Sequence, residues 1–241
     1  MISKSQIRYV KQLEMKKYRQ REGAFVAEGP KVVGDLTRSG FQPLAIFATE
    51  EWDGPCDNRV SGDELRKLSF LQHPQQVLAV FPIPEADVPA EASGLCLALD
   101  GVQDPGNLGT IIRLADWFGI DHIFCSPDTA DAWNPKVVQA TMGSIARVGI
   151  VYTNLEQLIG NCRLPVYSTL LDGEDLYRQE LSEEGIIVMG NEGNGISAPI
   201  RKLVNRKLLI PTFRTGDTAE SLNVAIATAI VCAEFRRRSR P

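Results

Sequence analysis

The sequence is poor in the side chains that most often bind metals or activate nucleophiles. It has only two histidines, His73 and His122, too few for a multi-histidine metal site or a histidine-centred catalytic triad. Its cysteines form no C-x-x-C pair, so neither a disulfide framework nor a zinc cluster is indicated. We therefore expect no metal site, and any catalysis must use other polar groups. The five cysteines are Cys56, Cys96, Cys125, Cys162 and Cys232, which we expect to be small buried hydrophobic residues.

Long hydrophobic runs are also missing. No apolar stretch approaches the roughly 20 residues of a membrane span, and the first residues, Met1 to Gln6, lack the apolar core of a secretory signal. These absences predict a cytoplasmic protein without a membrane partner. The chain has 241 residues, more than the usual single domain of about 100 to 150 residues, which favours two domains.

Net positive charge is absent as well. The formal net charge is −4 and the pI is about 5.4, which argues against a protein that coats nucleic acid with its whole surface. Both ends of the chain are nevertheless basic, and they could be RNA-binding surfaces or simply a solvated helix face and tail. The candidate RNA-binding residues at the N-terminal end are Lys4, Arg8, Lys11, Lys16, Lys17 and Arg19.

The first 85 residues have the pattern of a small α/β domain. Apolar residues among basic ones predict an amphipathic helix from Ile2 to Arg21, and strands are expected at 24–29, 43–48 and 76–81. Helices are expected after Gly29 and over 61–68. Residues 86–93, which are rich in proline and acidic residues, are expected to be a linker.

Residues 94–241 are expected to form a second α/β domain with a parallel sheet. Continuous apolar runs predict strands buried on both faces, and helical patterns lie between them. The expected strands are 95–99, 122–125, 145–151, 165–168, 185–189 and 208–210, and two of the expected helices are 109–118 and 135–142.

Three polar loops follow expected strands of this second domain, where ligands bind in open parallel sheets. The first contains Asn107 and Arg113, which could converge on one ligand. Alternatively, Asn107 caps a helix and Arg113 makes a surface ion pair. The second loop, 189–197, has three glycines that allow close approach of the backbone to a ligand. The third runs from Ile210 to Val224, where Ser221 could be a helix cap.

Taken together, the three loops resemble the signature motifs of the SpoU/TrmH branch of the SPOUT RNA methyltransferases. The resemblance covers nearly all of residues 95–235, and the N-terminal segment more loosely resembles the substrate-binding domain of this branch, an α/β sandwich similar to large-subunit ribosomal proteins. The matching motifs are Asn107-x-Gly109-x-x-x-Arg113, Gly190-Asn191-Glu192-Gly193-x-Gly195, and Ile210-Pro211 followed by Ser221-Leu222-Asn223-Val224.

The resemblance implies a trefoil-knotted methyltransferase domain, a homodimer, and S-adenosylmethionine as cofactor. It also implies methyl transfer to a ribose 2′-hydroxyl of RNA, with ribosomal RNA favoured over transfer RNA because of the N-terminal domain. The implied catalytic residues are Asn107, Arg113, Glu192, Ser221 and Asn223, and the implied cofactor-binding residues are Gly190, Asn191, Gly193, Ile210 and Leu222.

The motifs do not identify the group that accepts the proton of the ribose 2′-hydroxyl. A guanidinium stays protonated, so we expect Arg113 to bind an RNA phosphate and stabilise the developing alkoxide, while the proton passes to water or to Glu192. The loop 211–220 is longer than in the family and could reshape substrate access or cover the cofactor. A non-catalytic RNA-binding protein on the same fold is an alternative, whereas a nicotinamide-dependent enzyme would need a G-x-G-x-x-G fingerprint that the chain lacks.

Overall fold

The computed structural model describes residues 2–85, 92–217, 219 and 221–238. Contacts between residues divide the chain into two compact units, one formed by 1–85 with 131–147 and the other by 86–130 with 148–241. Most of the expected linker, residues 86–91, lies outside the described residues. Among the described residues, no helix has both the length and the apolar character needed to cross a membrane.

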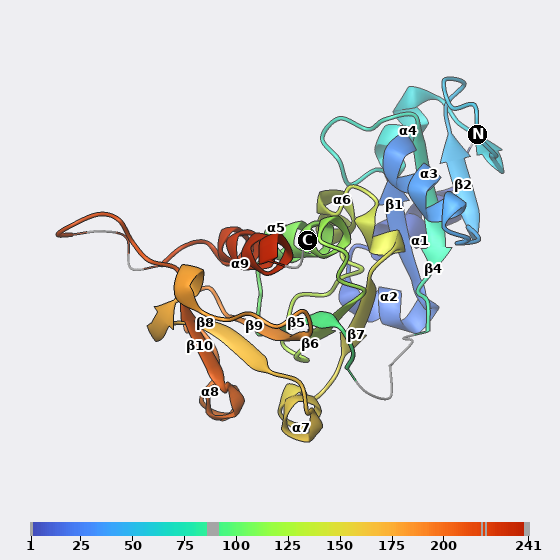
Figure 1. The fold of residues 1–241 in the computed structure, drawn as a ribbon. Coiled ribbons are helices and arrows are strands. Elements are labelled where there is room, and N and C mark those ends of the chain that lie inside the picture. Colours follow the sequence, from blue (N-terminus) through green and yellow to red (C-terminus); the bar gives the residue numbers. More distant parts are fainter. Residues whose placement is uncertain (1, 86–91, 218, 220, 239–241) are drawn as a thin grey trace. The chain divides into compact units, whose positions relative to one another are not determined.

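The N-terminal unit is a four-stranded sheet with helices. The strand order is β1-β4-β2-β3, with β4 antiparallel to both β1 and β2 and with β3 parallel to β2 (Figure 1). Its elements in residues 2–85 are α1 (Lys4–Gln12), α2 (Lys16–Glu22), β1 (Ala24–Glu28), α3 (Pro30–Arg38), β2 (Ala45–Ala48), β3 (Asn58–Arg59), α4 (Gly62–Leu68) and β4 (Val77–Pro82).

The expected helix over 2–21 is two helices. Its first part begins at a capping box in which Ser3 and Gln6 satisfy each other's backbone N–H groups. At the break, the buried Arg19 guanidinium donates to the Leu13 carbonyl at 2.8 Å and to the Glu14 carbonyl at 2.6 Å. These carbonyls are thus bound by a side chain of the following helix.

The segment 131–147 groups with the N-terminal unit, although the sequence places it between two strands of the second domain. It contains α6 (Pro135–Ala140) and the 3-10 helix η1 (Ser144–Ala146). Trp133 packs against Phe25 with ring centroids 4.6 Å apart, and Arg19 Nε donates to Asp131 at 3.0 Å. Residue 143 must be glycine, because its φ is 95° and a Cβ would lie 2.3 Å from an Asp35 carboxylate oxygen.

The second unit is built on a six-stranded sheet in which every pair of neighbouring strands is parallel. The strand order is β10-β8-β9-β5-β6-β7 (Figure 1). Its strands are β5 (Leu95–Asp100), β6 (His122–Cys125), β7 (Gly149–Tyr152), β8 (Val166–Asp175), β9 (Gly185–Gly190) and β10 (Arg206–Leu209). The remaining elements are α5 (Pro105–Trp117), α7 (Leu155–Asn161), η2 (Leu176–Arg178), α8 (Ala198–Leu203) and α9 (Val224–Arg238).

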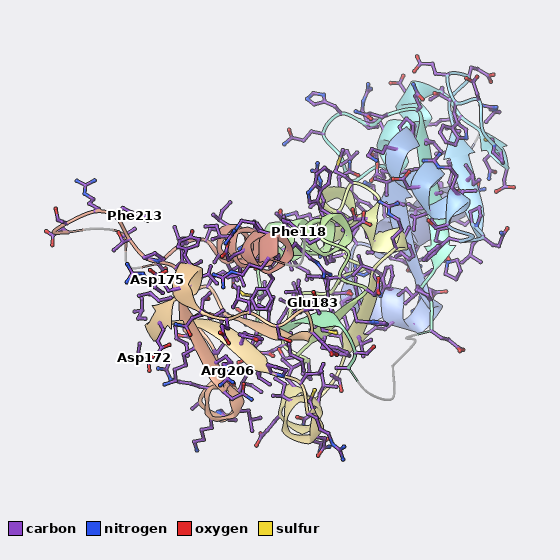
Figure 2. All side chains as sticks on the ribbon, viewed as in Figure 1. Phe118, Asp172, Asp175, Glu183, Arg206 and Phe213 are labelled. Carbon is purple, nitrogen blue, oxygen red and sulfur yellow. The ribbon has the colours of Figure 1, made fainter. Side chains whose placement is uncertain are left out.

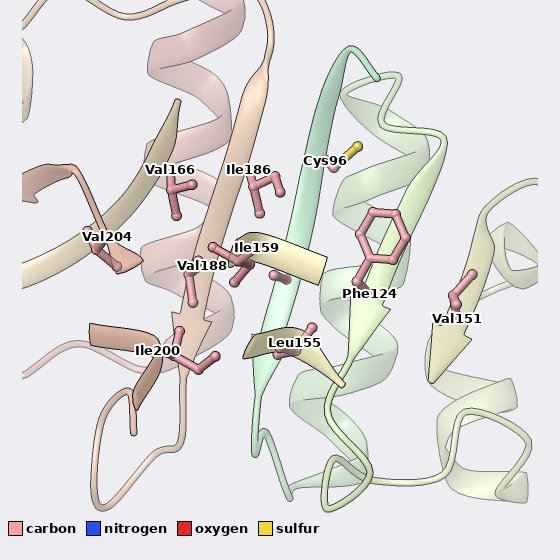
Figure 3. Close-up of a cluster of buried hydrophobic side chains, with 11 residues drawn as sticks. Cys96, Phe124, Val151, Leu155, Ile159, Val166, Ile186, Val188, Ile200 and Val204 are labelled. Carbon is pink, nitrogen blue, oxygen red and sulfur yellow. The ribbon is translucent and has the colours of Figure 1, made fainter. Parts of the chain in front are cut away.

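Helices cover both faces of this sheet. Figure 1 shows α5 and α9 on one face and α7 and α8 on the other. Near the β10 edge lies Asp172, which Figure 2 labels. It pairs with Arg201 at 2.6 Å and with Lys207 at 2.8 Å. Figure 3 shows the core under α7 and α8, where Leu155 and Ile200 pack with Phe124 and Val188 of the central strands.

The expected fold class is confirmed, and the central strands lie where the apolar runs predict them. The trefoil knot stays a prediction. The expected strand 145–151 is wrong in its first half, because residues 144–146 form η1 and the strand begins only at Gly149. Arg147 faces Asp35 at 3.8 Å in the N-terminal unit, so this stretch packs away from the sheet.

Candidate active site

Side chains from three distant stretches of the second unit meet in one chain of hydrogen bonds. The Asn223 side chain donates to Asn107 Oδ1 at 2.9 Å, and Asn107 Nδ2 donates to Glu192 Oε1 at 3.0 Å. Asn107 and Glu192 follow the neighbouring parallel strands β5 and β9, whose carboxyl ends share one edge of the sheet. Asn223 lies immediately before α9, which packs on α5.

Asn107 is free for this network because another residue caps its helix. Asp104 accepts the Asn107 backbone N–H at 2.8 Å, and Pro105 occupies the first turn. The interpretation of Asn107 as the cap is therefore wrong. Its side chain, in the first turn of α5, instead links Glu192 to Asn223.

Glu192 anchors the loop that leads into α5. Its carboxylate accepts the Gln103 N–H at 3.3 Å and the Asp104 N–H at 3.2 Å, in addition to the Asn107 amide. Partial burial acts to raise the pKa of Glu192, but these hydrogen bonds outweigh it and hold the pKa below the ordinary value. A carboxylate with a lowered pKa is a good acceptor for fixed N–H groups and a poor proton acceptor in catalysis.

The glycine-rich loop 190–195 folds tightly on itself. A Cβ at Gly190 would lie 2.4 Å from the backbone of Gly195, so only glycine fits. The Asn191 side chain donates to the Gly101 carbonyl at 2.7 Å and accepts the Gly193 N–H at 2.9 Å. Asn191 thus shapes the loop through its side chain and joins it to the end of β5.

The third loop ends at α9, and Asn223 is the residue that caps this helix. Asn223 Oδ1 accepts the Ala225 N–H at 2.9 Å and the Ile226 N–H at 3.3 Å. Ser221 is exposed and has no hydrogen-bond partner within the described residues, so the interpretation of Ser221 as the cap is wrong. Its hydroxyl is available to a ligand.

Arg113 stands apart from the network. It is exposed and makes no hydrogen bond or ion pair with any residue that the structure describes. It follows Asn107 by six positions in α5, a rise of about 9 Å. Glu192 forms hydrogen bonds with the loop before α5, and it forms none with Arg113.

The cofactor fit can be judged from the loops that carry the expected cofactor-binding residues. Leu222 is 50% exposed, and its backbone N–H and C=O have no hydrogen-bond partner within the described part of the chain. Ile210 is half-buried at the end of β10, and Gly193 is exposed on the tight loop. Backbone groups open to a ligand beside an apolar surface suit an adenosyl group, so these residues fit S-adenosylmethionine.

The third loop carries Phe213, which Figure 2 shows away from the sheet of the second unit, and its side chain is 90% exposed. The two roles proposed for the loop, shaping substrate access and covering the cofactor, both remain predictions.

The expected RNA-binding residues divide into two groups. Lys4, Arg8, Lys16 and Lys17 are exposed, whereas Lys11 is half-buried and lies 4.8 Å from the Phe70 ring centroid. Arg19 is corrected: only 1% of it is exposed and it is bound to Asp131, so it cannot face RNA in this fold. Its place in an otherwise basic, solvated segment concealed this role.

Three of the five cysteines are buried as expected, whereas Cys56 and Cys162 are only half-buried. Cys96, Cys125 and Cys232 are buried, and burial raises the pKa of Cys96 to about 11 and that of Cys232 to about 12, so these side chains stay as thiols. Within the described residues, no group of three or more histidines, cysteines and acids could hold a metal ion.

Sequence reasoning missed Gln103 and Asp104, whose backbone groups hold Glu192. The Asp104-Pro105 pair was a usable signal, since a capping acid followed by proline often begins a helix. The contacts with Glu192 join residues almost 90 positions apart, and no local pattern could have shown them.

Two family models match the chain. The model described as "SpoU rRNA Methylase family" matches residues 94–233, and the "MRM3-like substrate binding domain" matches residues 4–79. Among curated proteins, the 23S rRNA (guanosine(2553)-2′-O)-methyltransferase RlmP of Bacillus subtilis is 32% identical over 237 residues, which cover 94% of each chain.

Solved structures resemble the whole chain as well. A structure from Porphyromonas gingivalis, assigned to the TrmH family of RNA methyltransferases, is 42% identical with a TM-score of 0.89 and 99% coverage of both chains. The AdoMet-bound rRNA methyltransferase from Sinorhizobium meliloti is 30% identical with a TM-score of 0.86, covering 99% of this chain and 97% of the other.

Proposed function

The chain belongs to the SpoU rRNA Methylase family, and we propose on that premise that it methylates the ribose 2′-hydroxyl of a guanosine in ribosomal RNA. S-adenosylmethionine is the methyl donor. The guanosine and the ribosomal substrate are taken from the name of the Bacillus subtilis relative. The observation that carries the proposal is the hydrogen-bond chain from Glu192 through Asn107 to Asn223.

This network fixes neutral polar groups where a ribose can dock. Asn107 and Asn223 each offer amide groups without adding charge, and the exposed Ser221 hydroxyl lies two residues before Asn223. Such groups can orient a sugar hydroxyl for in-line attack, and positioning of this kind provides much of the rate advantage in group transfer.

Proton loss from the hydroxyl is assigned to water. The lowered pKa of Glu192, together with its engagement by Gln103, Asp104 and Asn107, makes it a positioning residue. Arg113 has an exposed guanidinium that can bind the neighbouring RNA phosphate and stabilise the developing alkoxide.

The methyl donor would be held by the backbone at Gly190, Ile210 and Leu222, with Asn191 and Gly193 shaping the loop between them. When bound, it supplies an electrophilic sulfonium methyl group. The role of the protein is to hold the ribose oxygen in line with that methyl and to exclude water from it.

The proposal includes a homodimer and a cytoplasmic location, where ribosomal RNA is found. Large apolar side chains on α5 and around the start of α9 support the dimer, since Trp117 is 83% exposed, Leu222 50% and Ile226 53%. The N-terminal unit would bind the RNA backbone through the exposed cations Lys4, Arg8, Lys16 and Lys17.

Methyl incorporation tests the proposal directly. The full-length protein is incubated with S-adenosylmethionine carrying a labelled methyl group and with ribosomal or transfer RNA from cells that lack the gene, and 2′-O-methyl sites are mapped. Label in ribosomal RNA at a guanosine ribose supports the proposal. Label only in transfer RNA would reassign the substrate, and RNA binding without transfer would indicate a non-catalytic RNA-binding protein.

Two substitutions test the assigned roles. Asn107→Ala should lower turnover by about a hundredfold, while Asn161→Ala, at the exposed end of α7, should leave it unchanged. Arg113→Lys should lower turnover without weakening cofactor binding, because lysine lacks the bidentate guanidinium. Full turnover of Arg113→Lys would refute its assigned role.

A further inference from the structure

The N-terminal unit contains a recess that the methyl-transfer site does not use. Its volume is about 410 Å³, within the range of small-molecule sites. The lining includes Val60 and Leu65, which are 7% and 2% exposed, so buried apolar side chains contribute to its surface. An apolar surface of this kind suits the face of a planar ring.

The polar part of the lining comes from Thr49, Glu50, Glu51, Ser61, Arg66 and Gln76. Within the described residues, the side chains of Glu50, Glu51 and Gln76 have no hydrogen-bond or ion-pair partner, whereas Arg66 pairs with Asp63 at 2.8 Å. The two carboxylates accept hydrogen bonds and cannot donate them. The recess therefore offers unpaired acceptors beside an apolar surface, and its two unpaired acids outnumber its one cation, which is already paired with Asp63.

The backbone around these side chains is held in place. Arg59 Nη1 donates to the Thr49 carbonyl at 2.6 Å and to the Trp52 carbonyl at 2.9 Å, which fixes the turn carrying Glu50 and Glu51. Gln76 has a φ of 32°, uncommon for a residue with a side chain, and its carbonyl accepts the Thr49 N–H at 2.8 Å. The backbone that carries these side chains is thus fixed before any ligand binds, whereas the exposed Glu50 and Glu51 carboxylates have no partner that fixes their orientation within the described residues.

We propose that this recess binds one unstacked RNA nucleobase that carries an imino N–H, either uracil or guanine. The inference rests on the proposed RNA substrate. Uracil presents N3–H and guanine presents N1–H and an amino group on the Watson–Crick edge, so both can donate to Glu50 or Glu51. Adenine and cytosine have an unprotonated ring nitrogen at the corresponding position, which a carboxylate repels, so they can donate only through the amino group beside it. Proteins commonly read single-stranded RNA by bonding this edge of splayed-out bases.

The test measures binding of the full-length protein to fluorescein-labelled oligo(U), oligo(A) and oligo(C) decamers by anisotropy. The wild type should prefer oligo(U). The double variant Glu50→Gln/Glu51→Gln should bind oligo(U) about tenfold more weakly and lose the preference, because each substitution replaces one of the two carboxylate oxygens by an amide N–H donor and removes the negative charge that favours an imino N–H.

A matched control separates this effect from net charge. Glu14→Gln/Asp53→Asn removes two exposed acids of the same unit that do not line the recess. Removing negative charge alone should leave RNA binding unchanged or strengthen it. The proposal is supported if Glu50→Gln/Glu51→Gln weakens oligo(U) binding while Glu14→Gln/Asp53→Asn does not. It is overturned if both double variants bind more tightly, or if the wild type binds the three decamers equally.

Methyl incorporation into ribosomal RNA, measured in parallel, keeps the two proposals distinct. Methylation without base preference refutes the recess as a base site and leaves the proposed function standing. Absence of both methylation and RNA binding refutes the proposed function, and the recess inference falls with it.

Discussion

The two basic ends of the chain place their cations in opposite environments. On α1 and α2, Lys4, Arg8, Lys16 and Lys17 are exposed to solvent. At the end of α9, Arg236 binds the Phe118 and Gly119 carbonyls, while Arg237 and Arg238 pair with Glu234. A run of cations can thus face a polyanionic ligand or bind the protein's own acceptors, and only the neighbouring acceptors distinguish the two cases.

Arg19 is the exception in the N-terminal group, and replacing it should have the largest effect on stability. Arg19→Ala removes the ion pair with Asp131 and the bonds to the Leu13 and Glu14 carbonyls. We expect a loss of about 3 to 5 kcal/mol in the free energy of unfolding, because Asp131 is left uncompensated. Urea denaturation measures it. Lys17→Ala in the same helix is the control, and equal losses for both would remove the distinction.

Arg238→Ala should have the next largest effect. Besides Glu234, Arg238 binds the Leu176 carbonyl at 3.3 Å and the Tyr177 carbonyl at 2.8 Å, joining α9 to η2. We expect a loss of about 2 kcal/mol. Arg237 also pairs with Glu234, but its side chain is 67% exposed, so Arg237→Ala should cost less than about 1 kcal/mol. A larger loss for Arg237→Ala by thermal unfolding would contradict this ordering.

The acid that binds the C-terminal arginines should make stability depend on pH. The hydrogen bond from Arg237 and the pairing with Arg238 outweigh partial desolvation and lower the pKa of Glu234 to about 2, from an ordinary value of 4.5. Because the folded-state pKa is depressed, this stabilisation is present above about pH 4.5 and is lost as the pH falls toward 2.

The measurement is the free energy of unfolding against pH for the wild type and for Glu234→Gln. The variant should lack this component of acid destabilisation, whereas Glu183→Gln, at an exposed position, should follow the wild type. Identical profiles for Glu234→Gln and the wild type would show that the arginines do not depend on this carboxylate.

Replacing exposed lysines of α2 should change stability least, although it should weaken RNA binding. Lys16→Ala/Lys17→Ala alters two exposed side chains and should shift the free energy of unfolding by less than about 0.5 kcal/mol. Its RNA affinity should fall severalfold, and the slope of log affinity against log salt should become shallower by about one for each phosphate that the variant no longer binds. Unchanged affinity at low salt would mean that these lysines only solvate the helices.

The sequence was most informative where local pattern decides structure. The apolar runs at 95–99, 122–125 and 185–189 all lie within strands, since strands buried on both faces need continuous apolar residues. The motif residues Asn107, Glu192 and Asn223 do meet. The sequence did not show which residues begin the helices beside them. Asp104 caps α5 in place of Asn107, and Asn223 caps α9 in place of Ser221.

The failures of prediction share a long-range cause. At the break between α1 and α2, the Leu13 and Glu14 carbonyls are bound by Arg19, which is itself held by Asp131, 112 positions away. The loss of strand at 144–146 occurs in a segment that packs on the N-terminal unit, where Gly143 meets Asp35. The spacing of apolar residues predicts which face of a helix or strand is buried. It does not predict which of the two units that face packs against.

The grouping of residues 131–147 with residues 1–85 has a consequence for synthesis. Trp133 and Asp131 cannot meet Phe25 and Arg19 until the ribosome has reached position 133, which is 48 residues beyond position 85. At about 5 to 20 residues per second, the N-terminal unit waits several seconds for its last piece. Part of the second unit is therefore translated before the N-terminal unit can complete its contacts.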